Sequence, residues 1–200
     1  MSAYIPGIIY ENVKIMLTKY RGYEITSPVL TPGQLTERFN HFEHVVISCV
    51  RKEHILGPSM LTCIIISPGS KYSDKSADFK KLINPHLKDG GPGILIVSSA
   101  ELSPFITKFI ADEPRIEARL YKHFASVKPE SDSVPHHQIA TEEEVVEYCN
   151  TFYADRKKFP KINSHDVMGI WMGIRPGMTM RIDRVSETGG IAVVYRYCKG

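Results

Sequence analysis

The fold of the C-terminal part is decided by the stretch Gly173-Ile-Arg-Pro-Gly177 and the two runs that follow it. The first run is Met178-Thr-Met-Arg-Ile-Asp-Arg-Val185, and the second, after five intervening residues, is Ile191-Ala-Val-Val-Tyr-Arg-Tyr197. Apolar and polar residues alternate along 178–185 with the period of a half-buried strand. Between the two runs, Ser186-Glu-Thr-Gly-Gly190 offers two glycines for positive φ in a turn. The pattern predicts a β-hairpin entered through a Pro-Gly turn. None of the hairpin side chains resembles a catalytic nucleophile. They include Arg181, Arg184 and Arg196, which are suited to docking against a partner.

Size and composition are those of an ordinary globular protein. The 200 residues allow one large domain or two small ones, and 42% of them are hydrophobic. The longest apolar runs are too short to cross a bilayer, and Met1–Gly7 lacks the regions of a secretory signal, so we expect neither a membrane segment nor a signal. The four cysteines lack metal-like spacing and are expected to be reduced, buried thiols inside a cell; they are Cys49, Cys63, Cys149 and Cys198.

Charge is unevenly distributed along the chain. The formal net charge is only +3, too small to indicate nucleic-acid binding by itself. Residues 128–155 carry net −6, whereas residues 156–200 carry net +6. An acidic band beside a basic tail fits a surface with two different neighbours, and it equally fits solvated faces that happen to segregate.

The first 127 residues read as an α/β unit with its own core. Gly57-Pro58 separates the first two β-branched runs, which predicts a hairpin. The run Ile94–Ser98 is wholly apolar, as in a strand buried on both faces. We expect helices over 8–21, 31–39, 73–87 and 103–112, and strands over 44–50, 61–67, 94–98 and 115–127.

The remaining residues read as a second, smaller unit. Polar, proline-bearing residues 128–138 are predicted to be a linker. Thr141 and Glu144 have the spacing of a capping box, in which Glu144 reaches back to the helix start. The expected apolar stripe of that helix includes Val145, Val146, Cys149, Phe152 and Tyr153. Ser164 is expected to cap a short helix over 165–172.

The search for catalytic chemistry finds little. His136-His137 is a vicinal pair whose side chains point apart on a strand, without a third ligand at metal spacing. The glutamates at 142–144 are better explained by helix capping than by acid–base catalysis. The hairpin arginines could bind phosphate or carboxylate, or they could simply form a solvated face, and the sequence leaves both alternatives open.

Several motifs, in order over about 65 residues, resemble the C-terminal assembly domain of RNA polymerase subunit 5, the small subunit common to the nuclear polymerases, and its archaeal relative. The family's Arg-Pro-Ser-Glu-Thr-Ala-Gly and Tyr-Arg are the strongest match. The matching segments are Val134-Pro-His-His137, Thr141-Glu-Glu-Glu144, Phe159-Pro-Lys-Ile162 with Asp166, Gly173-Ile-Arg-Pro-Gly177, Arg184-Val-Ser-Glu-Thr-Gly-Gly190 and Tyr195-Arg196.

The N-terminal part resembles the family's jaw domain more loosely, through Arg21-Gly22-Tyr23 and Ser103-Pro104. The archaeal relative lacks this domain, so the resemblance indicates a eukaryotic-type chain, either a divergent isoform or the copy of a large DNA virus. Val185, Ile191 and Ala192 depart from the family pattern, which implies a changed contact surface on the hairpin.

The resemblance implies an α+β or α/β chain with an N-terminal jaw domain over 1–130 and a C-terminal assembly domain over 134–200. It implies a non-catalytic subunit without a cofactor, metal or homo-oligomer, docked on the largest polymerase subunit beside the other subunits, with weak contact to downstream duplex DNA through Ser103 and Pro104. The expected location is the nucleus, or the host cytoplasm or virion for a viral copy. The expected docking or turn-forming set is Pro160, Asp166, Gly173, Arg175, Gly177, Arg184, Ser186, Glu187, Thr188, Gly190, Tyr195 and Arg196.

Two alternative functions compete with this one. The family's jaw resembles restriction-endonuclease-like folds, so a metal-dependent nuclease is one alternative. Its Mg²⁺ site would need carboxylates on adjacent strands, and the runs 45–50, 61–66 and 94–97 contain no Asp or Glu. The other alternative is a free-standing nucleic-acid-binding module, whose sign would be tight, salt-dependent DNA binding.

Overall fold

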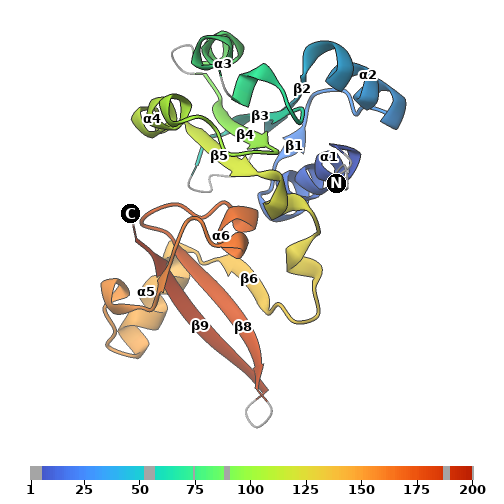
Figure 1. Cartoon of the computed structure of the whole chain (residues 1–200). Coiled ribbons are helices and arrows are strands. Elements are labelled where there is room, and N and C mark those ends of the chain that lie inside the picture. Colours follow the sequence, from blue (N-terminus) through green and yellow to red (C-terminus); the bar gives the residue numbers. More distant parts are fainter. Residues whose placement is uncertain (1–5, 52–56, 74, 88–90, 187–189, 200) are drawn as a thin grey trace. The chain divides into compact units, whose positions relative to one another are not determined.

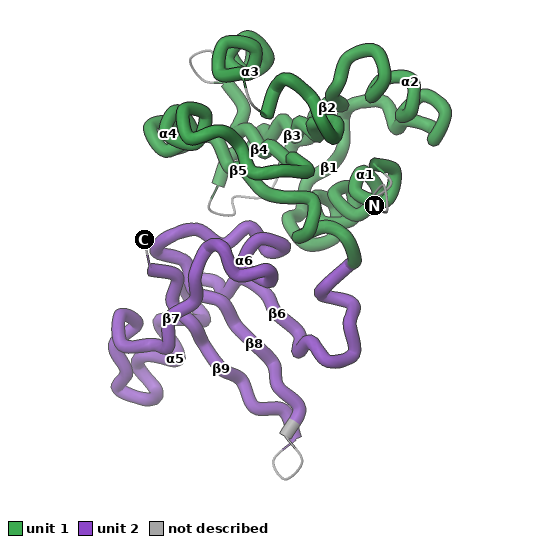
Figure 2. The backbone as a smooth tube through the Cα atoms, viewed as in Figure 1, with its two compact units in different colours: residues 1–126 green, residues 127–200 purple. Residues whose placement is uncertain are grey.

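The chain forms two compact units, residues 1–126 and 127–200, each with its own sheet (Figure 2). This computed structural model describes residues 6–51, 57–73, 75–87, 91–186 and 190–199. Parallel and antiparallel pairs occur in both sheets, and helices flank them (Figure 1), which confirms the predicted α/β character.

The five-stranded sheet of the first unit has the order β1-β2-β3-β4-β5. The pair β2–β3 is antiparallel, confirming the predicted hairpin, and β3–β4–β5 is parallel. All six residues of β4 are buried, as its continuous apolar run predicts. The strands are β1 (Glu24–Ile25), β2 (His44–Val50), β3 (Met60–Ile66), β4 (Gly93–Ser98) and β5 (Ile116–Leu120).

Helices lie on both sides of this sheet. α3 (Ser76–Ile83) and α4 (Pro104–Asp112) cover one face, where Phe79, Ile83 and Ile106 pack on alternate residues of β3 and β4. α1 (Pro6–Ile15) and α2 (Pro32–Phe42) lie on the other side (Figure 1). Thr31 caps α2 with Gln34 in a capping box.

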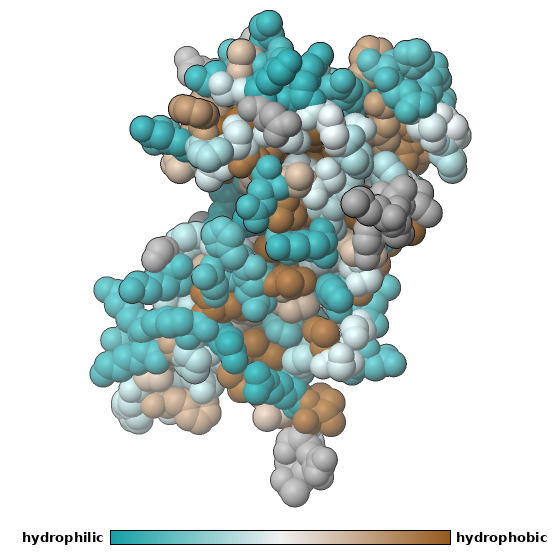
Figure 3. All heavy atoms as spheres, in the orientation of Figure 1, coloured by the Kyte–Doolittle hydropathy of each residue, from teal (hydrophilic) through white to brown (hydrophobic). Residues whose placement is uncertain are grey.

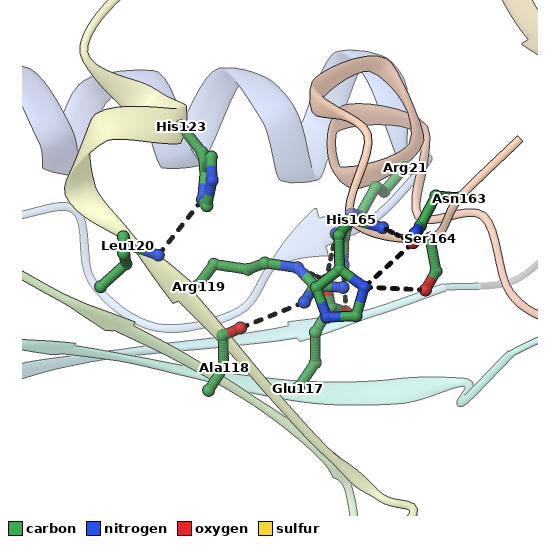
Figure 4. Close-up of polar contacts among 9 residues, drawn as sticks. All are labelled: Arg21, Glu117, Ala118, Arg119, Leu120, His123, Asn163, Ser164 and His165. Atoms are coloured by element: carbon green, nitrogen blue, oxygen red, sulfur yellow. Dashed lines mark hydrogen bonds and ion pairs between the residues drawn. The ribbon is translucent and has the colours of Figure 1, made fainter. Parts of the chain in front are cut away.

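The strand predicted over 115–127 is wrong in its second half. β5 ends at Leu120, and a 3-10 turn, Tyr121–Phe124, follows it. The Leu120 N–H donates to Nδ1 of His123 at 3.2 Å (Figure 4), and the Tyr121 hydroxyl donates to the carbonyl of Ile66 at 2.6 Å. These contacts turn the chain out of the sheet while Phe124 stays buried.

The second unit is built on a four-stranded sheet of order β6-β8-β9-β7. β8 (Thr179–Ser186) and β9 (Gly190–Cys198) pair antiparallel from Thr179–Tyr197 to Ser186–Gly190, which confirms the predicted hairpin. β6 (His136–Ile139) and β7 (Lys161–Ile162) are the outer strands. The fully buried Met180 on β8 belongs to the core of this unit.

Part of the predicted linker belongs to this sheet. β6 pairs antiparallel with β8, His136 lying opposite Asp183. A 3-10 turn over Lys128–Glu130 contacts α6 (Val167–Met172). The segment is polar because β6 is an edge strand whose side chains are only partly covered, and this hid it from the sequence pattern.

Two local expectations in the second unit also need correction. Asp166, rather than Ser164, caps α6, its Oδ1 accepting from the Met168 N–H at 2.9 Å. Nδ1 of His165 instead lies within hydrogen-bond distance of the side-chain oxygens of Asn163 and Ser164 (Figure 4).

The predicted stripe of α5 (Glu142–Thr151) is only half right. Val145 is buried, but the helix stops at Thr151. Phe152 and Tyr153 therefore lie beyond it, 63% and 98% exposed. None of the described helices is long and apolar enough to cross a membrane.

Candidate functional site

The Pro-Gly turn before β8 depends on left-handed backbone. Gly173 ends α6 at φ +69°, and Gly177 has φ +91°, values that side-chain-bearing residues rarely adopt. The Gly177 N–H donates to the carbonyl of Cys198 at 2.9 Å, which ties the turn to the end of β9. Arg175 is carried between the two glycines and is half-buried.

Arg156 fastens this turn to two other elements. Its Nη2 donates to the carbonyl of Gly177 at 2.7 Å, and its Nε donates to Oγ1 of Thr179 at 3.0 Å. Its Nη1 contacts Oε2 of Glu142, the first residue of α5, at 2.7 Å. Sequence reasoning missed this residue because it begins a basic run whose other members are exposed lysines, and no local pattern separates it from them.

Glu144 joins α5 to the hairpin. The Thr141 hydroxyl accepts from its N–H at 3.2 Å, as predicted. Its carboxylate, however, does not complete the capping box: Oε1 accepts from the Tyr195 hydroxyl at 2.7 Å and from Nη1 of Arg181 at 2.8 Å. Burial raises the pKa of Tyr195 to about 12, and the hydrogen bond to Glu144 adds to this rise. Tertiary partners thus replace the local cap.

The network continues along β8 to the edge strand. Nε of Arg181 donates to Oδ1 of Asp183 at 2.7 Å, and this hydrogen bond holds the pKa of Asp183 below its usual value. Nδ1 of His136 lies 3.5 Å from the other carboxylate oxygen of Asp183. Arg181 is therefore engaged within the unit.

The distal half of the hairpin carries an exposed surface. Val185 and Ile191 face each other across the strands and are 90% and 69% exposed; Val193, two pairs further in, is 37% exposed. Brown apolar spheres stand beside the grey hairpin tip in Figure 3. Arg184 is also exposed. We call Arg184, Val185, Ile191 and Val193 the hairpin surface.

The other predicted docking residues lie in or beside the strands of this unit. Pro160 leads into β7, and its carbonyl accepts from the Tyr197 N–H at 2.9 Å. Arg196 is partly buried, and its Nε lacks a hydrogen-bond partner within the described chain. Gly190 has φ +76° and pairs with the backbone of Ser186. Glu187 and Thr188 lie outside the described residues.

Ser103 and Pro104 begin α4 in the first unit. Ser103 occupies the cap position, but its hydroxyl accepts no hydrogen bond from the helix and is buried without a partner in the described chain. Pro104 and the following Phe105 are exposed, Phe105 by 79%.

The described residues hold no group of three or more His, Cys, Asp or Glu side chains that could bind a metal ion. Glu117 on β5 is engaged by Arg21 at 2.8 and 3.0 Å and by Arg119 at 3.1 Å (Figure 4). His137 contacts the carbonyl of Pro135 at 2.6 Å, and burial lowers its pKa.

The cysteines are free thiols. Burial raises the pKa of Cys49 to about 12 and shifts that of Cys63 in the same direction, so both stay protonated and unreactive near neutral pH.

Together the fold and site define a two-unit protein whose exposed hairpin suits binding to other proteins. Comparison with known proteins identifies its family. The family model for RNA polymerase Rpb5, C-terminal domain, matches residues 129–198. A DNA-directed RNA polymerase RPB5 homolog of African swine fever virus (isolate Tick/South Africa/Pretoriuskop Pr4/1996) is 29% identical over 152 residues, covering 71% of this chain and 74% of the relative.

Two relatives from cellular organisms belong to the same family. DNA-directed RNA polymerase subunit Rpo5 of the archaeon Methanococcoides burtonii is 31% identical over 67 residues, 34% of this chain and 86% of the relative. The subunit rpabc1 of RNA polymerases I, II and III of Dictyostelium discoideum is 25% identical over 109 residues, 52% of this chain and 55% of the relative. The chain belongs to the Rpb5 family, as a divergent member, and is an RNA polymerase subunit that acts in transcription.

Proposed function

We propose that the second unit docks this subunit on the largest subunit of a multisubunit DNA-dependent RNA polymerase, and that the first unit extends as a jaw toward downstream DNA. In this proposal the domains are the jaw, residues 1–130, and the assembly domain, residues 134–200. The subunit contributes no catalytic residue of its own and works by holding polymerase parts together.

The hairpin surface is the observation that carries the docking role. Val185 and Ile191 form an apolar cross-strand pair that stays exposed at 90% and 69%. Exposed apolar side chains gathered on one strand pair favour a protein partner, since their burial gains about 25 cal/mol per Å². Arg184, paired with Ala192, has its side chain on the opposite face of the two strands, where it gives a partner that covers both faces a cation to pair with.

The remaining docking residues divide by role. Arg175 and Arg196 are proposed as further contacts at the base of the hairpin, and Ser186, Glu187 and Thr188 as contacts at its turn. The residues that hold these contacts in position are Pro160, Asp166, Gly173, Gly177, Gly190 and Tyr195.

The jaw role is proposed with weak DNA contact at Ser103 and Pro104. The exposed Pro104 can lie against the DNA backbone, whereas the buried Ser103 hydroxyl would have to turn outward to reach a phosphate; contacts of this kind carry no sequence readout. The complex would work in the nucleus for a cellular copy, and in the host cytoplasm or virion for a viral one.

The docking proposal is tested by co-purification. The tagged full-length chain, expressed in cells that contain its polymerase, should bring down the two largest subunits in stoichiometric amounts. Arg184→Glu and Val185→Asp should each abolish that recovery. Lys158→Glu, a charge reversal at another exposed position of the same unit, should not. Equal recovery with Arg184→Glu, or no polymerase subunit with the unmodified chain, would overturn the proposal.

DNA binding separates the jaw role from that of a free-standing DNA-binding module. The purified chain should bind duplex DNA weakly in a gel-shift titration at physiological salt. Nanomolar binding under those conditions would contradict the account of the chain as a polymerase subunit alone.

A further inference from the structure

We propose that the end of α5 is a second protein-binding surface, which takes a basic amphipathic segment of another protein. The α5 patch consists of Val146, Phe152 and Tyr153 with the carboxylates of Glu143 and Glu147. Its three apolar side chains are 54%, 63% and 98% exposed. None of its residues belongs to the hairpin surface. In Figure 3, pale brown side chains reach the surface over the α5 end of the second unit.

The backbone at Tyr153 has a left-handed conformation that is unfavourable for a residue with a side chain. The Ala154 N–H donates to the carbonyl of Cys149 at 2.9 Å, a bond that ends the helix and places Tyr153 in the left-handed region at φ +48°. Glycine is the favoured residue there, because a Cβ is unfavourable in that conformation. Tyr153 makes no hydrogen bond or ring contact within the described chain, so its side chain does not offset the strain.

Glu43 provides the comparison. It is the other non-glycine residue with positive φ among those described, at +57°. Its carboxylate accepts from the Ser70 hydroxyl at 3.0 Å, so a contact within the unit accounts for the side chain there. A large aromatic at Tyr153, kept fully exposed in a conformation that favours glycine, points instead to a contact outside the chain.

A cluster of aromatic rings in tilted and edge-to-face contact supports the patch. The ring of Phe152 lies 4.6 Å from that of Tyr148, which in turn lies 4.6 Å from Tyr195 and 5.7 Å from Phe159. Phe152 is therefore held in place while more than half of it faces solvent. A fixed, exposed aromatic loses little conformational entropy when a partner covers it.

The charge around the patch selects the partner. Glu142 and Glu144 are engaged by arginines of this unit, whereas Glu143 and Glu147 are exposed and make no ion pair with a described residue. These two carboxylates flank Val146, at three residues before it and one after it, on the exposed side of α5. They favour Lys or Arg on the partner, and an arginine can also stack on Tyr153. They disfavour nucleic acid.

The test uses the purified full-length chain and a fluorescein-labelled amphipathic helical peptide of leucine and arginine, followed by fluorescence anisotropy. Tyr153→Gly should weaken peptide binding by roughly tenfold, while the midpoint of urea unfolding rises because the strain is relieved. Glu143→Lys with Glu147→Lys should weaken binding and reduce its salt dependence. Glu37→Lys, at an exposed position of α2, is the matched control and should change neither the peptide affinity nor its salt dependence.

Three results would overturn the proposal. The first is equal peptide affinity for Tyr153→Gly and the unmodified chain. The second is a lower unfolding midpoint in that variant. The third is a dimer in sedimentation that Tyr153→Gly dissociates, since the patch would then bind a second copy of the chain. The assay contains no polymerase, so its outcome is independent of the docking proposal.

Discussion

Glu144 and Tyr195, 51 residues apart in the chain, are joined by a 2.7 Å hydrogen bond from the tyrosine hydroxyl to Oε1 of the carboxylate. The same oxygen accepts from Arg181 at 2.8 Å. One carboxylate oxygen thus connects α5 to both strands of the hairpin. The position of the hairpin relative to its covering helix depends on this junction.

Replacing Tyr195 with Phe tests the junction. The ring packing on Tyr148 is retained, but the hydroxyl donor to Glu144 is lost, which should lower the free energy of unfolding by about 1 to 2 kcal/mol. Urea unfolding followed by fluorescence reports on this unit, because Trp171 is the single tryptophan and is fully buried in α6. Tyr153→Phe removes an exposed hydroxyl and should leave the stability unchanged; an equal loss in both variants would contradict the assignment.

Alkaline pH should weaken the same junction. The pKa of Tyr195 is raised from 10.0 to about 12 in the folded chain, so folding favours its protonated form. Its contribution is fully present below pH 10 and is lost as pH rises through about 12. Urea midpoints read from Trp171 between pH 9 and 12 should therefore fall less steeply in Tyr195→Phe. Identical slopes would show that Tyr195 does not carry this dependence.

The hairpin could be predicted because its information is local: alternating strands, paired glycines and a Pro-Gly entry. The Glu144 network could not. Thr141 and Glu144 have the spacing of a capping box, and only the fold brings Arg181 and Tyr195 close enough to take the carboxylate instead. The exposure of Val185 follows from the pattern, because alternation from the buried Met178, Met180 and Ile182 places position 185 on the other face of the strand.

Arg156→Lys should destabilise the second unit by about 2 kcal/mol. A lysine keeps the charge, but its ammonium group cannot reach Gly177, Thr179 and Glu142 in the planar arrangement that the guanidinium provides. The measurement is again the urea midpoint from Trp171. The exposed neighbour Lys158→Ala serves as the control and should be nearly neutral. A neutral Arg156→Lys would mean that charge alone suffices.

Gly177→Ala should cost about 1 to 2 kcal/mol through backbone strain alone. An added Cβ at Gly177 would meet no atom within 4 Å, so a clash is not the cause; the φ of +91° is. Gly177→Asn is the matched variant, because asparagine tolerates positive φ better than alanine does, and it should cost less. If both variants lose the same stability, the turn does not depend on its left-handed conformation.

The double variant Val185→Thr with Ile191→Thr should separate binding from folding. Both side chains are more than two-thirds exposed, so polar β-branched replacements should change the free energy of unfolding by less than about 0.5 kcal/mol. Ile182→Thr, on the same strand but 3% exposed, should cost about 2 kcal/mol or more, because it puts a hydroxyl in the core. Recovery of polymerase subunits by the tagged chain should fall at least about tenfold in the double variant. A stable double variant that still recovers them fully would move the docking contact away from this apolar pair.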